Sequence, residues 1–290
     1  MAQSGPKKPL TCPLCQAADP HLFYHENNYN YWQCHACKLL FLWPAPDSPF
    51  LHDHYQEYLS IDNQEVVAWG EEMQPVINNT ADSLDDLFPE KGRVLDIGCG
   101  YGFFLKEMQQ RGWQIEGVEL SKPAAAIARQ QTGALIHSTG VEEMKIDKQF
   151  DVITMFYVIE HVADPVTILQ SVRQLLAPGG ILVLRYPNTS PLFRLHRGIA
   201  RKLRLMQAPS HLYDYHGTSM PLLLKKAGFQ SYRITINTNT APANIAKRFI
   251  SCYIGLFGIL LSHWSNDRIL LPGFSRTAYV SVQSGFFPQT

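Results

Sequence analysis

Short apolar runs alternate with longer amphipathic stretches from about residue 93 onward. Apolar runs of this kind are typical of strands in a parallel sheet, because helices bury both faces of such a sheet. The intervening stretches, such as Phe103–Met108 and Ser219–Ala227, predict helices. The pattern therefore predicts an α/β fold with a doubly wound sheet. Seven runs predict its strands, at residues 94–97, 114–119, 134–137, 150–156, 181–186, 230–237 and 276–283.

The chain upstream of this pattern divides into two parts. Residues 1–45 are rich in cysteine, histidine and aromatic residues and run into the proline-dense Trp43–Pro49, which predicts a small module and a stiff connection. Residues 46–90 predict a linker and a helical segment, with Asp82–Leu87 as the end of a helix that Pro89 stops. We assign residues 91–290 to the large domain, with insertions at 191–209 and 245–270.

Composition limits the class of protein and its partners. The 290 residues are 46% hydrophobic and 17% charged, which is enough apolar material for one substantial core. Equal counts of 25 basic and 25 acidic residues give no net charge to attract nucleic acid, so no nucleic-acid partner is expected. No apolar run follows the lysines of residues 1–10, so we expect a cytoplasmic location. The oligomeric state is open.

Four of the six cysteines form two tight pairs, Cys12-x2-Cys15 and Cys34-x2-Cys37, with 18 residues between the pairs. This spacing predicts a four-cysteine, zinc-ribbon-like site, in which four thiolates complete a closed tetrahedron around a structural Zn2+. A redox dithiol is the alternative, but neither pair has a thioredoxin-like βαβ context. Three nearby histidines could each replace a cysteine ligand: His21, His25 and His35.

A glycine-rich loop follows the first predicted strand. The strand ends at Asp96 and leads into Gly98, Gly100 and Gly102, so the backbone can turn sharply and approach a ligand closely. Glu119 ends the second predicted strand, where a carboxylate can accept both hydroxyls of a ribose. Together these residues predict adenosine binding, although any βαβ unit needs glycines at its first turn.

The same segment resembles a known family. Val94–Gly102 resembles the first motif of class I S-adenosylmethionine-dependent methyltransferases, and Phe150–Ile153 with Val158–Val162 resembles the fourth-strand motif of their quinone-biosynthesis and sugar-modifying branches. Leu175–Gly180 resembles the turn before their fifth strand. The resemblance implies a Rossmann-like seven-stranded sheet, with strands six and seven as an antiparallel pair, and S-adenosyl-L-methionine as the cofactor.

By this resemblance Asp96 and the first two glycines of the loop border the methionine part of the cofactor, and Glu119 holds its ribose. The family often carries an aspartate after strand three that reads the adenine amino group, and this sequence lacks it. Backbone groups at Val141 or the side chain of Glu142 would substitute. The candidate cofactor residues are Asp96, Gly98, Cys99, Gly100, Gly102, Phe103, Glu119, Leu120, Val141, Glu142 and Phe156.

The candidate catalytic residues follow strands four and five. His161 is the first candidate base, because it follows strand four at the ligand-binding edge of the sheet. The alternative is that Glu160 and His161 cap the next helix. His211 begins an aromatic cluster, residues 211–216, that suits either a pocket lid or packing between elements. Some quinone-type relatives carry a metal-binding carboxylate where Tyr157 stands, so Tyr157 is a third candidate and no catalytic metal is expected.

Two insertions suggest a surface for lipid. Residues 191–209 predict a basic amphipathic helix, and Phe249–Leu261 is an uncharged apolar run too short to span a membrane. Packing of both segments on the domain is the alternative. The sequence thus predicts a methyltransferase acting on a sugar, a polysaccharide precursor or a lipid-linked or quinone-like compound, with peripheral membrane contact. The competing hypotheses are an NAD-dependent oxidoreductase, disfavoured by Phe103 at the sixth fingerprint position, and a catalytically silent scaffold.

Overall fold

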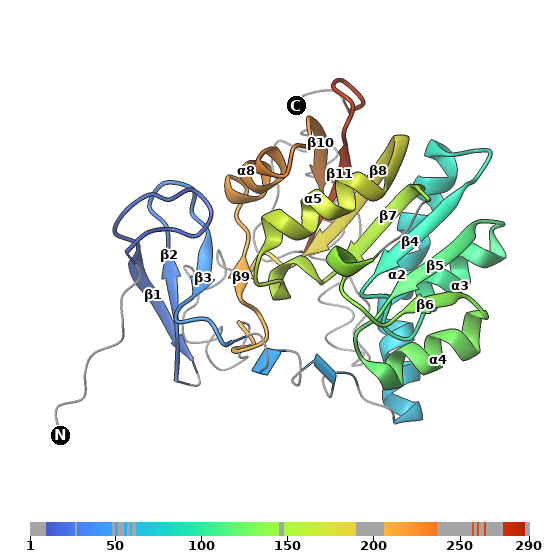
Figure 1. The fold of residues 1–290 in the computed structure, drawn as a ribbon, viewed down its shortest axis with the longest axis horizontal. Coiled ribbons are helices and arrows are strands. Elements are labelled where there is room, and N and C mark those ends of the chain that lie inside the picture. Colours follow the sequence, from blue (N-terminus) through green and yellow to red (C-terminus); the bar gives the residue numbers. More distant parts are fainter. Residues whose placement is uncertain are drawn as a thin grey trace.

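In the computed structural model, the residues whose placement is described form two sheets, one of seven strands and one of four (Figure 1). It describes residues 10–26, 28–47, 50, 51, 55, 56, 59, 62–144, 148–189, 206–236, 257, 260, 264 and 275–287. The large sheet has the order β10-β11-β8-β7-β4-β5-β6. Its strands are β4 (Arg93–Ile97), β5 (Gln114–Val118), β6 (Leu135–His137), β7 (Phe150–Phe156), β8 (Leu176–Tyr186), β10 (Ser231–Thr235) and β11 (Arg276–Ser281).

All seven predicted strands are present, and the five from β4 to β8 are parallel to their neighbours. The end of the sheet differs in detail from the expected terminal pair. β11 pairs antiparallel with β10, as predicted, but it also pairs antiparallel with β8 and lies between the two. Strand seven is therefore inserted into the sheet and strand six forms its edge. This order agrees with burial, since every residue of β11 is buried whereas Tyr232 and Arg233 on β10 are exposed.

Helices cover both faces of this sheet, as the continuous apolar strands require. They are α2 (Asn63–Leu87), α3 (Phe103–Gln110), α4 (Lys122–Thr132), α5 (Pro165–Leu175) and α8 (Ser219–Lys226), with the 3-10 turns η1 (Val141–Glu143) and η2 (Ile159–His161). One core cluster packs α5 and α8 on one face, and a second packs α2 and α3 on the other. The side chain of Asp62 caps α2, which ends at Leu87 as Pro89 predicts.

β8 begins earlier than the sequence predicts. The strand starts at Leu176, directly after α5, and so includes the predicted turn at residues 177–180. The register of β8 against β7 shifts at this point, from Phe150 opposite Leu176 to Val152 opposite Ile181. Gly179, with φ of 81°, absorbs this irregularity, because a left-handed backbone is inexpensive only for glycine.

The cysteine-rich segment forms the small sheet. Its strands are β1 (His21–Glu26), β2 (Tyr29–Gln33) and β3 (Leu40–Leu42), and the fourth strand is β9 (Tyr213–Asp214) from the distant aromatic cluster. β9 pairs antiparallel with β3, through Leu40 opposite Asp214 and Phe41 opposite Tyr213. In Figure 1 β9 runs between the small sheet and the main domain. The chain downstream of β8 thus completes the sheet of the N-terminal module.

The two predicted insertions lie almost wholly outside the described residues. This applies to the basic amphipathic helix, of which only residues 206–209 are described, and to the apolar run, of which only Phe257 and Leu260 are described. Within the described parts of the chain, no helix combines the length and the apolar character needed to cross a bilayer.

Candidate active site

The site lies where the order of the large sheet reverses. From β4 the chain proceeds outward through β5 and β6, and then returns to place β7 on the other side of β4. Ligands of open α/β sheets bind at such a switch point, beyond the carboxyl ends of the strands. A buried hydrogen bond spans the switch point, because the hydroxyl of Thr154 on β7 donates to Oδ1 of Asp96 on β4 at 2.6 Å.

Asp96 is a buried carboxyl group with a perturbed pKa. Only 2% of the residue is exposed. Burial, together with the negative charge of Glu119, raises the pKa of Asp96 to about 7 despite the hydrogen bond from Thr154. A carboxyl group with this pKa changes charge near neutral pH, and a bound cationic ligand would stabilise its ionised form.

The glycine loop has the backbone geometry that its sequence predicts. Gly98, Gly100 and Gly102 all have positive φ, with values of 73°, 54° and 84°. A Cβ atom on Gly98 would lie 2.4 Å from Cγ2 of Val158, so this position also has no room for a side chain. The close approach fixes the loop after β4 against the loop after β7. Gly102 then begins α3 in the left-handed conformation.

Glu119 joins this loop to the end of β5. Its Oε2 accepts a hydrogen bond from the Gly100 N–H at 2.9 Å, and its Oε1 accepts from the Ser121 N–H at 2.8 Å. Each carboxylate oxygen has two lone pairs, so both oxygens can still accept a hydroxyl. The side chain is therefore held rigidly with spare capacity for a diol such as a ribose.

The other candidate cofactor residues surround this centre to different degrees. Val141 is buried in η1, after β6, whereas Glu142 beside it is exposed. The Phe103 ring stacks on Trp69, with centroids 6.0 Å apart, so it packs α2 against α3. Two more candidates are also committed to packing: Cys99 lies in a small core cluster with Leu105 and Ile136, and the Phe156 ring lies 4.9 Å from that of Phe104. Leu120, half-buried after Glu119, accepts a hydrogen bond on its backbone carbonyl.

Residues before α2 also reach the site, and sequence reasoning did not identify them. The side chain of Gln56 donates Nε2–H to the backbone carbonyl of Leu120 at 2.6 Å. The backbone carbonyl of Gln56 accepts a hydrogen bond from the Ser121 hydroxyl. The side chain of Leu59 lies over the Gly100 position, 3.9 Å from where a Cβ would be. Gln56 and Leu59 thus contact the loops after β5 and β4. The sequence around these two residues shows no motif that would have assigned them to the site.

A second group of candidate residues lies around η2. His161 donates Nδ1–H to the carbonyl of Ser210 at 2.8 Å, since a carbonyl can only accept, and this leaves Nε2 as the unprotonated nitrogen of the neutral ring. The ring of His211 lies 4.8 Å from that of His161, edge to face. Burial and the nearby His161 lower the pKa of His211 to about 3, so His211 is neutral and a weak base. The structure thus brings the two candidate histidines together and distinguishes their chemistry.

Glu160, which the sequence alone suggested only as a helix cap, is a candidate site residue in the structure. It is fully buried, and neither carboxylate oxygen has a hydrogen-bond partner among the residues that the structure describes. Burial, with the charge of Asp214, raises its pKa to about 8. One ligand atom from each of Glu160, His161 and His211 lies within 4.8 Å of the others. This cluster can therefore accept a hydrogen-bond donor or a cation.

Tyr157 occupies a strained position beside this cluster. Its φ is 57°, which is costly for an aromatic residue and is maintained only by specific contacts. Its hydroxyl accepts from Nε of the buried Arg185 at 2.9 Å and donates to the Ser275 hydroxyl at 3.0 Å. Both hydrogen-bonding roles of the hydroxyl are thus used within the protein, which makes Tyr157 a structural support for Arg185 more than a free acid or base.

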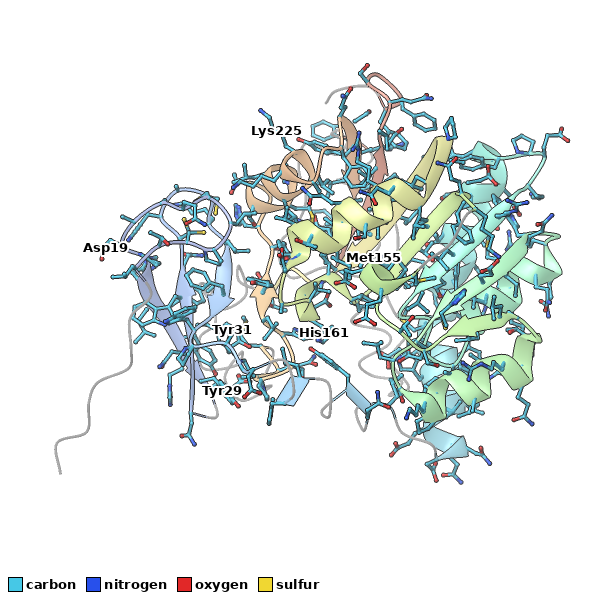
Figure 2. The ribbon with its side chains drawn as sticks, viewed as in Figure 1. Asp19, Tyr29, Tyr31, Met155, His161 and Lys225 are labelled. Carbon is cyan, nitrogen blue, oxygen red and sulfur yellow. The ribbon has the colours of Figure 1, made fainter. Side chains whose placement is uncertain are left out.

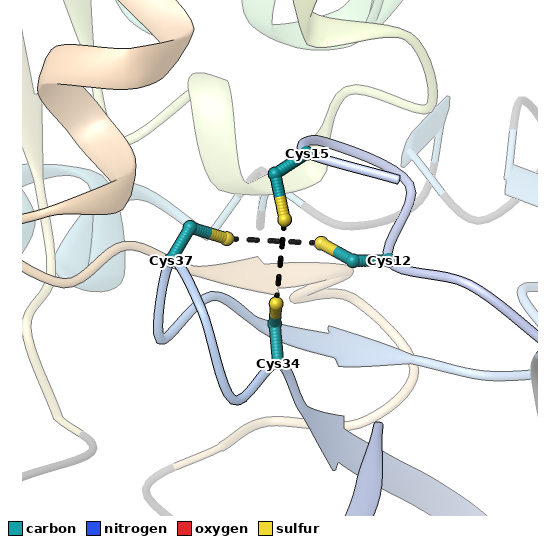
Figure 3. Close-up of side chains that lie close together, drawn as sticks. All are labelled: Cys12, Cys15, Cys34 and Cys37. Atoms are coloured by element: carbon teal, nitrogen blue, oxygen red, sulfur yellow. Dashed lines mark hydrogen bonds between the residues drawn. The ribbon is translucent and has the colours of Figure 1, made fainter. Parts of the chain in front are cut away.

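The four paired cysteines converge on one point (Figure 3). All four sulfur atoms lie within 4.8 Å of one another, with Cys12 and Cys37 at 3.7 Å and Cys15 and Cys34 at 3.4 Å. These distances exclude disulfides, whose S–S bond is about 2.05 Å. A tetrahedron with Zn–S bonds of about 2.3 Å has sulfur–sulfur edges of roughly 3.8 Å. The arrangement of the thiols therefore fits a tetrahedral metal ion.

The match to a family model identifies this fold. The model described as "Methyltransferase domain" matches residues 69–233, more than half of the chain, from α2 to β10. The chain belongs to the methyltransferase domain family. A similar protein is the ubiquinone biosynthesis O-methyltransferase of Leptothrix cholodnii, with 31% identity over 147 residues, 48% of this chain and 60% of the relative. The enzyme of the same name from Nitrosococcus oceani is 30% identical over 156 residues, 49% of this chain and 65% of the relative.

Solved structures show the same fold. A SAM-dependent methyltransferase from Thermotoga maritima superposes with a TM-score of 0.54 and 18% identity, covering 80% of this chain and all of that protein, 100%. Magnesium protoporphyrin IX methyltransferase from Synechocystis, with bound SAH, has a TM-score of 0.53 and 15% identity over 81% of this chain and 100% of that protein. The methyltransferase domain thus has the Rossmann-like fold that the sequence motifs predict.

Proposed function

We propose that the protein transfers a methyl group from S-adenosyl-L-methionine to a small-molecule acceptor, namely a sugar, a polysaccharide precursor or a lipid-linked or quinone-like compound. The observation that carries the proposal is the carboxylate pair at the switch point, Asp96 and Glu119, on either side of the glycine loop in a methyltransferase domain. The curated relatives named for ubiquinone biosynthesis support a quinone-like acceptor. The chain spans 60% and 65% of the length of those two relatives, so the acceptor class rests on partial similarity.

The residues present fit the cofactor. When bound, S-adenosylmethionine supplies a methyl group on a cationic sulfonium centre. Asp96 offers a buried carboxyl group to the ammonium of the methionine part, and Glu119 offers two fixed oxygens to the ribose. Nε2 of His161 can remove a proton from the acceptor. The carboxyl group of Glu160, which has no hydrogen-bond partner among the described residues, can bind a polar group of the acceptor. Neither role for η2 needs a metal ion.

We propose that the cysteine cluster binds a structural Zn2+ and that the module comprises residues 1–45, followed by a connecting segment at 46–90. A small module gains most of its folding energy from such a metal, because its own core is small. Membrane contact through the two insertions also stays a proposal, tested by co-sedimentation with anionic liposomes.

The family match gives no support to an NAD-dependent oxidoreductase. Calorimetry with NAD and with S-adenosylhomocysteine (SAH) tests the cofactor directly. A methyltransferase binds SAH, an oxidoreductase binds NAD, and a silent scaffold binds neither.

We expect Glu119→Gln to weaken SAH binding by about 10- to 100-fold, since hydrogen bonds to a charged group contribute about 1.5–3 kcal/mol each. The amide keeps the shape of the side chain but loses the charge and one acceptor oxygen. Titration calorimetry measures the change. Glu143→Gln is the matched control, because Glu143 is exposed and lies in η1 beside the candidate Glu142. Equal SAH affinity in the two variants would remove Glu119 from the cofactor site.

The pKa of Asp96, about 7, predicts opposite pH dependences for stability and cofactor affinity. In the folded protein the proton is held more tightly than in the unfolded chain, so the contribution of Asp96 to the free energy of unfolding falls as the pH rises from about 4 to about 7. SAH affinity instead rises across this range, because the cofactor ammonium favours the ionised carboxylate. Calorimetry at pH 5.5 to 8, in two buffers of different ionisation enthalpy, detects the proton released on binding. Asp96→Asn should flatten the affinity profile, and a flat profile in the unaltered protein contradicts this role.

A further inference from the structure

Residues 206–218, here called the strap, lie between the cysteine module and η2. On the module side, the strap forms β9, which pairs with β3. The Leu42 N–H donates to the strap carbonyl of Leu212 at 2.9 Å. The hydroxyl of Tyr31, on β2, donates to the strap carbonyls of Met206 at 3.1 Å and His211 at 2.7 Å. The module therefore holds the strap through backbone carbonyls at several points along its length.

Two further contacts tie the ends of the strap to the module. At one end, the buried carboxylate of Glu26 accepts the Ala208 N–H at 3.1 Å. At the other end, the Thr218 hydroxyl donates to the carbonyl of Cys37 at 2.6 Å. Because Cys37 belongs to the proposed metal site, the backbone of a ligand turn bonds directly to the strap. An ordered cysteine cluster thus holds the strap at Thr218, while Tyr31 holds it at Met206 and His211.

On its other side the strap holds η2. The Leu212 N–H donates to the carbonyl of Glu160 at 2.8 Å, and the carbonyl of Ser210 accepts Nδ1–H of His161 at 2.8 Å. Tyr55 adds a cross-link, since its hydroxyl lies 3.1 Å from the carbonyl of Ser210 and 3.2 Å from that of His161. The contact with Ser210 fixes both the ring orientation and the tautomer of His161.

We propose that the cysteine module is a positioning element of the acceptor side, and that Tyr31 is its principal positioning residue. The inference rests on the proposed function, in which Nε2 of His161 serves as the base. Figure 2 shows Tyr31 in the module and His161 at the side of the main domain that faces it. Tyr31 is fully buried and its hydroxyl bonds to the carbonyl of His211, one residue from Ser210. The side chains of Asp96 and Glu119 make no hydrogen bond to Tyr31 or to the strap among the described residues, so SAH binding should not depend on Tyr31.

The test compares Tyr31→Phe with Tyr29→Phe. Both substitutions remove one hydroxyl from β2, but the structure shows no side-chain hydrogen bond from Tyr29 to any described residue, so Tyr29→Phe controls for the loss of a tyrosine hydroxyl from the module. Hydrogen exchange followed by mass spectrometry reports peptides that span the strap and residues 157–162. Calorimetry with SAH reports the cofactor site, and turnover is measured with the acceptor that a methylation screen identifies.

In Tyr31→Phe we expect exchange across residues 206–212 to be faster by about tenfold, as local opening becomes easier when two buried carbonyls lose their donor. We expect kcat to fall by a similar factor, with SAH affinity within about twofold of the unaltered protein. Tyr29→Phe should match the unaltered protein in all three measurements. Unchanged exchange in Tyr31→Phe overturns the proposal, and so does a parallel loss of SAH affinity. If the unaltered protein binds no SAH, the proposed function fails, whereas the exchange comparison still decides whether the module holds the strap.

Discussion

Replacing Cys34 and Cys37 together by serine is expected to abolish metal binding and to unfold the N-terminal module. Four-cysteine coordination of Zn2+ contributes about 10–16 kcal/mol to the folding of small zinc domains at neutral pH, which is comparable to the whole stability of an ordinary domain. The strands β1 to β3 cannot offset this loss, because their core cluster includes Met206, Ala208 and Leu212 from the strap. Elemental analysis measures the metal, and circular dichroism with thermal unfolding measures the loss of structure.

Cys252→Ser is the matched control, because Cys252 lies outside both cysteine pairs in the sequence and should keep one metal ion per chain. SAH binding distinguishes local from global unfolding. The glycine loop, Asp96 and Glu119 have no hydrogen bond to the module among the described residues, so the double variant should still bind SAH. Full metal content in the double variant would exclude these cysteines as ligands, and loss of SAH binding would show that the module and the main domain unfold together.

Sequence patterns predicted the large sheet well because its central strands, β4, β7 and β8, are largely buried on both faces. β7 and β8 show the longest apolar runs, whereas β5 has polar residues at two of its five positions. The position of β11 between β8 and β10 was beyond these patterns, since strand order depends on contacts between segments far apart in the sequence. The same limit applies to β9, a strand of two residues that pairs with the module and is too short to show periodicity.

The candidate site also contains residues that the sequence indicated and residues that only the structure revealed. Asp96, Glu119 and the three glycines were predictable because their roles follow from local backbone geometry at a strand end. Glu160 was interpreted as a cap because nothing in a Glu-His pair shows that one member is fully buried. Tyr31 and Gln56 were missed because they reach the site only through tertiary contacts with Met206, His211 and Leu120. Such residues have no sequence signal without a structure.

His161→Ala is expected to lower turnover by about 10²–10⁴-fold, the usual contribution of general base catalysis, while SAH affinity stays within about twofold. The hydrogen bond from Nδ1 to the carbonyl of Ser210 places the proton of the neutral ring on Nδ1, so Nε2 is the nitrogen proposed as the proton acceptor. Because the substitution also leaves space for a small ring, added imidazole should restore part of the activity. The measurement is methyl transfer to the acceptor identified by the screen, with kcat and KM determined separately.

His211→Ala separates base catalysis from packing. Its lowered pKa, about 3, leaves His211 a poor proton acceptor at neutral pH, so its removal should act through the buried space it fills. We therefore expect a smaller fall in turnover than for His161→Ala, together with a lower melting temperature and no rescue by imidazole. His25→Ala provides the control, since His25 is exposed on β1 and bonds to Asn30. If His161→Ala and His211→Ala both turn over as fast as the unaltered protein, histidine base catalysis is removed from the mechanism. Acceptor deprotonation would then fall to Glu160, whose pKa of about 8 places its ionisation within the working range of an enzyme.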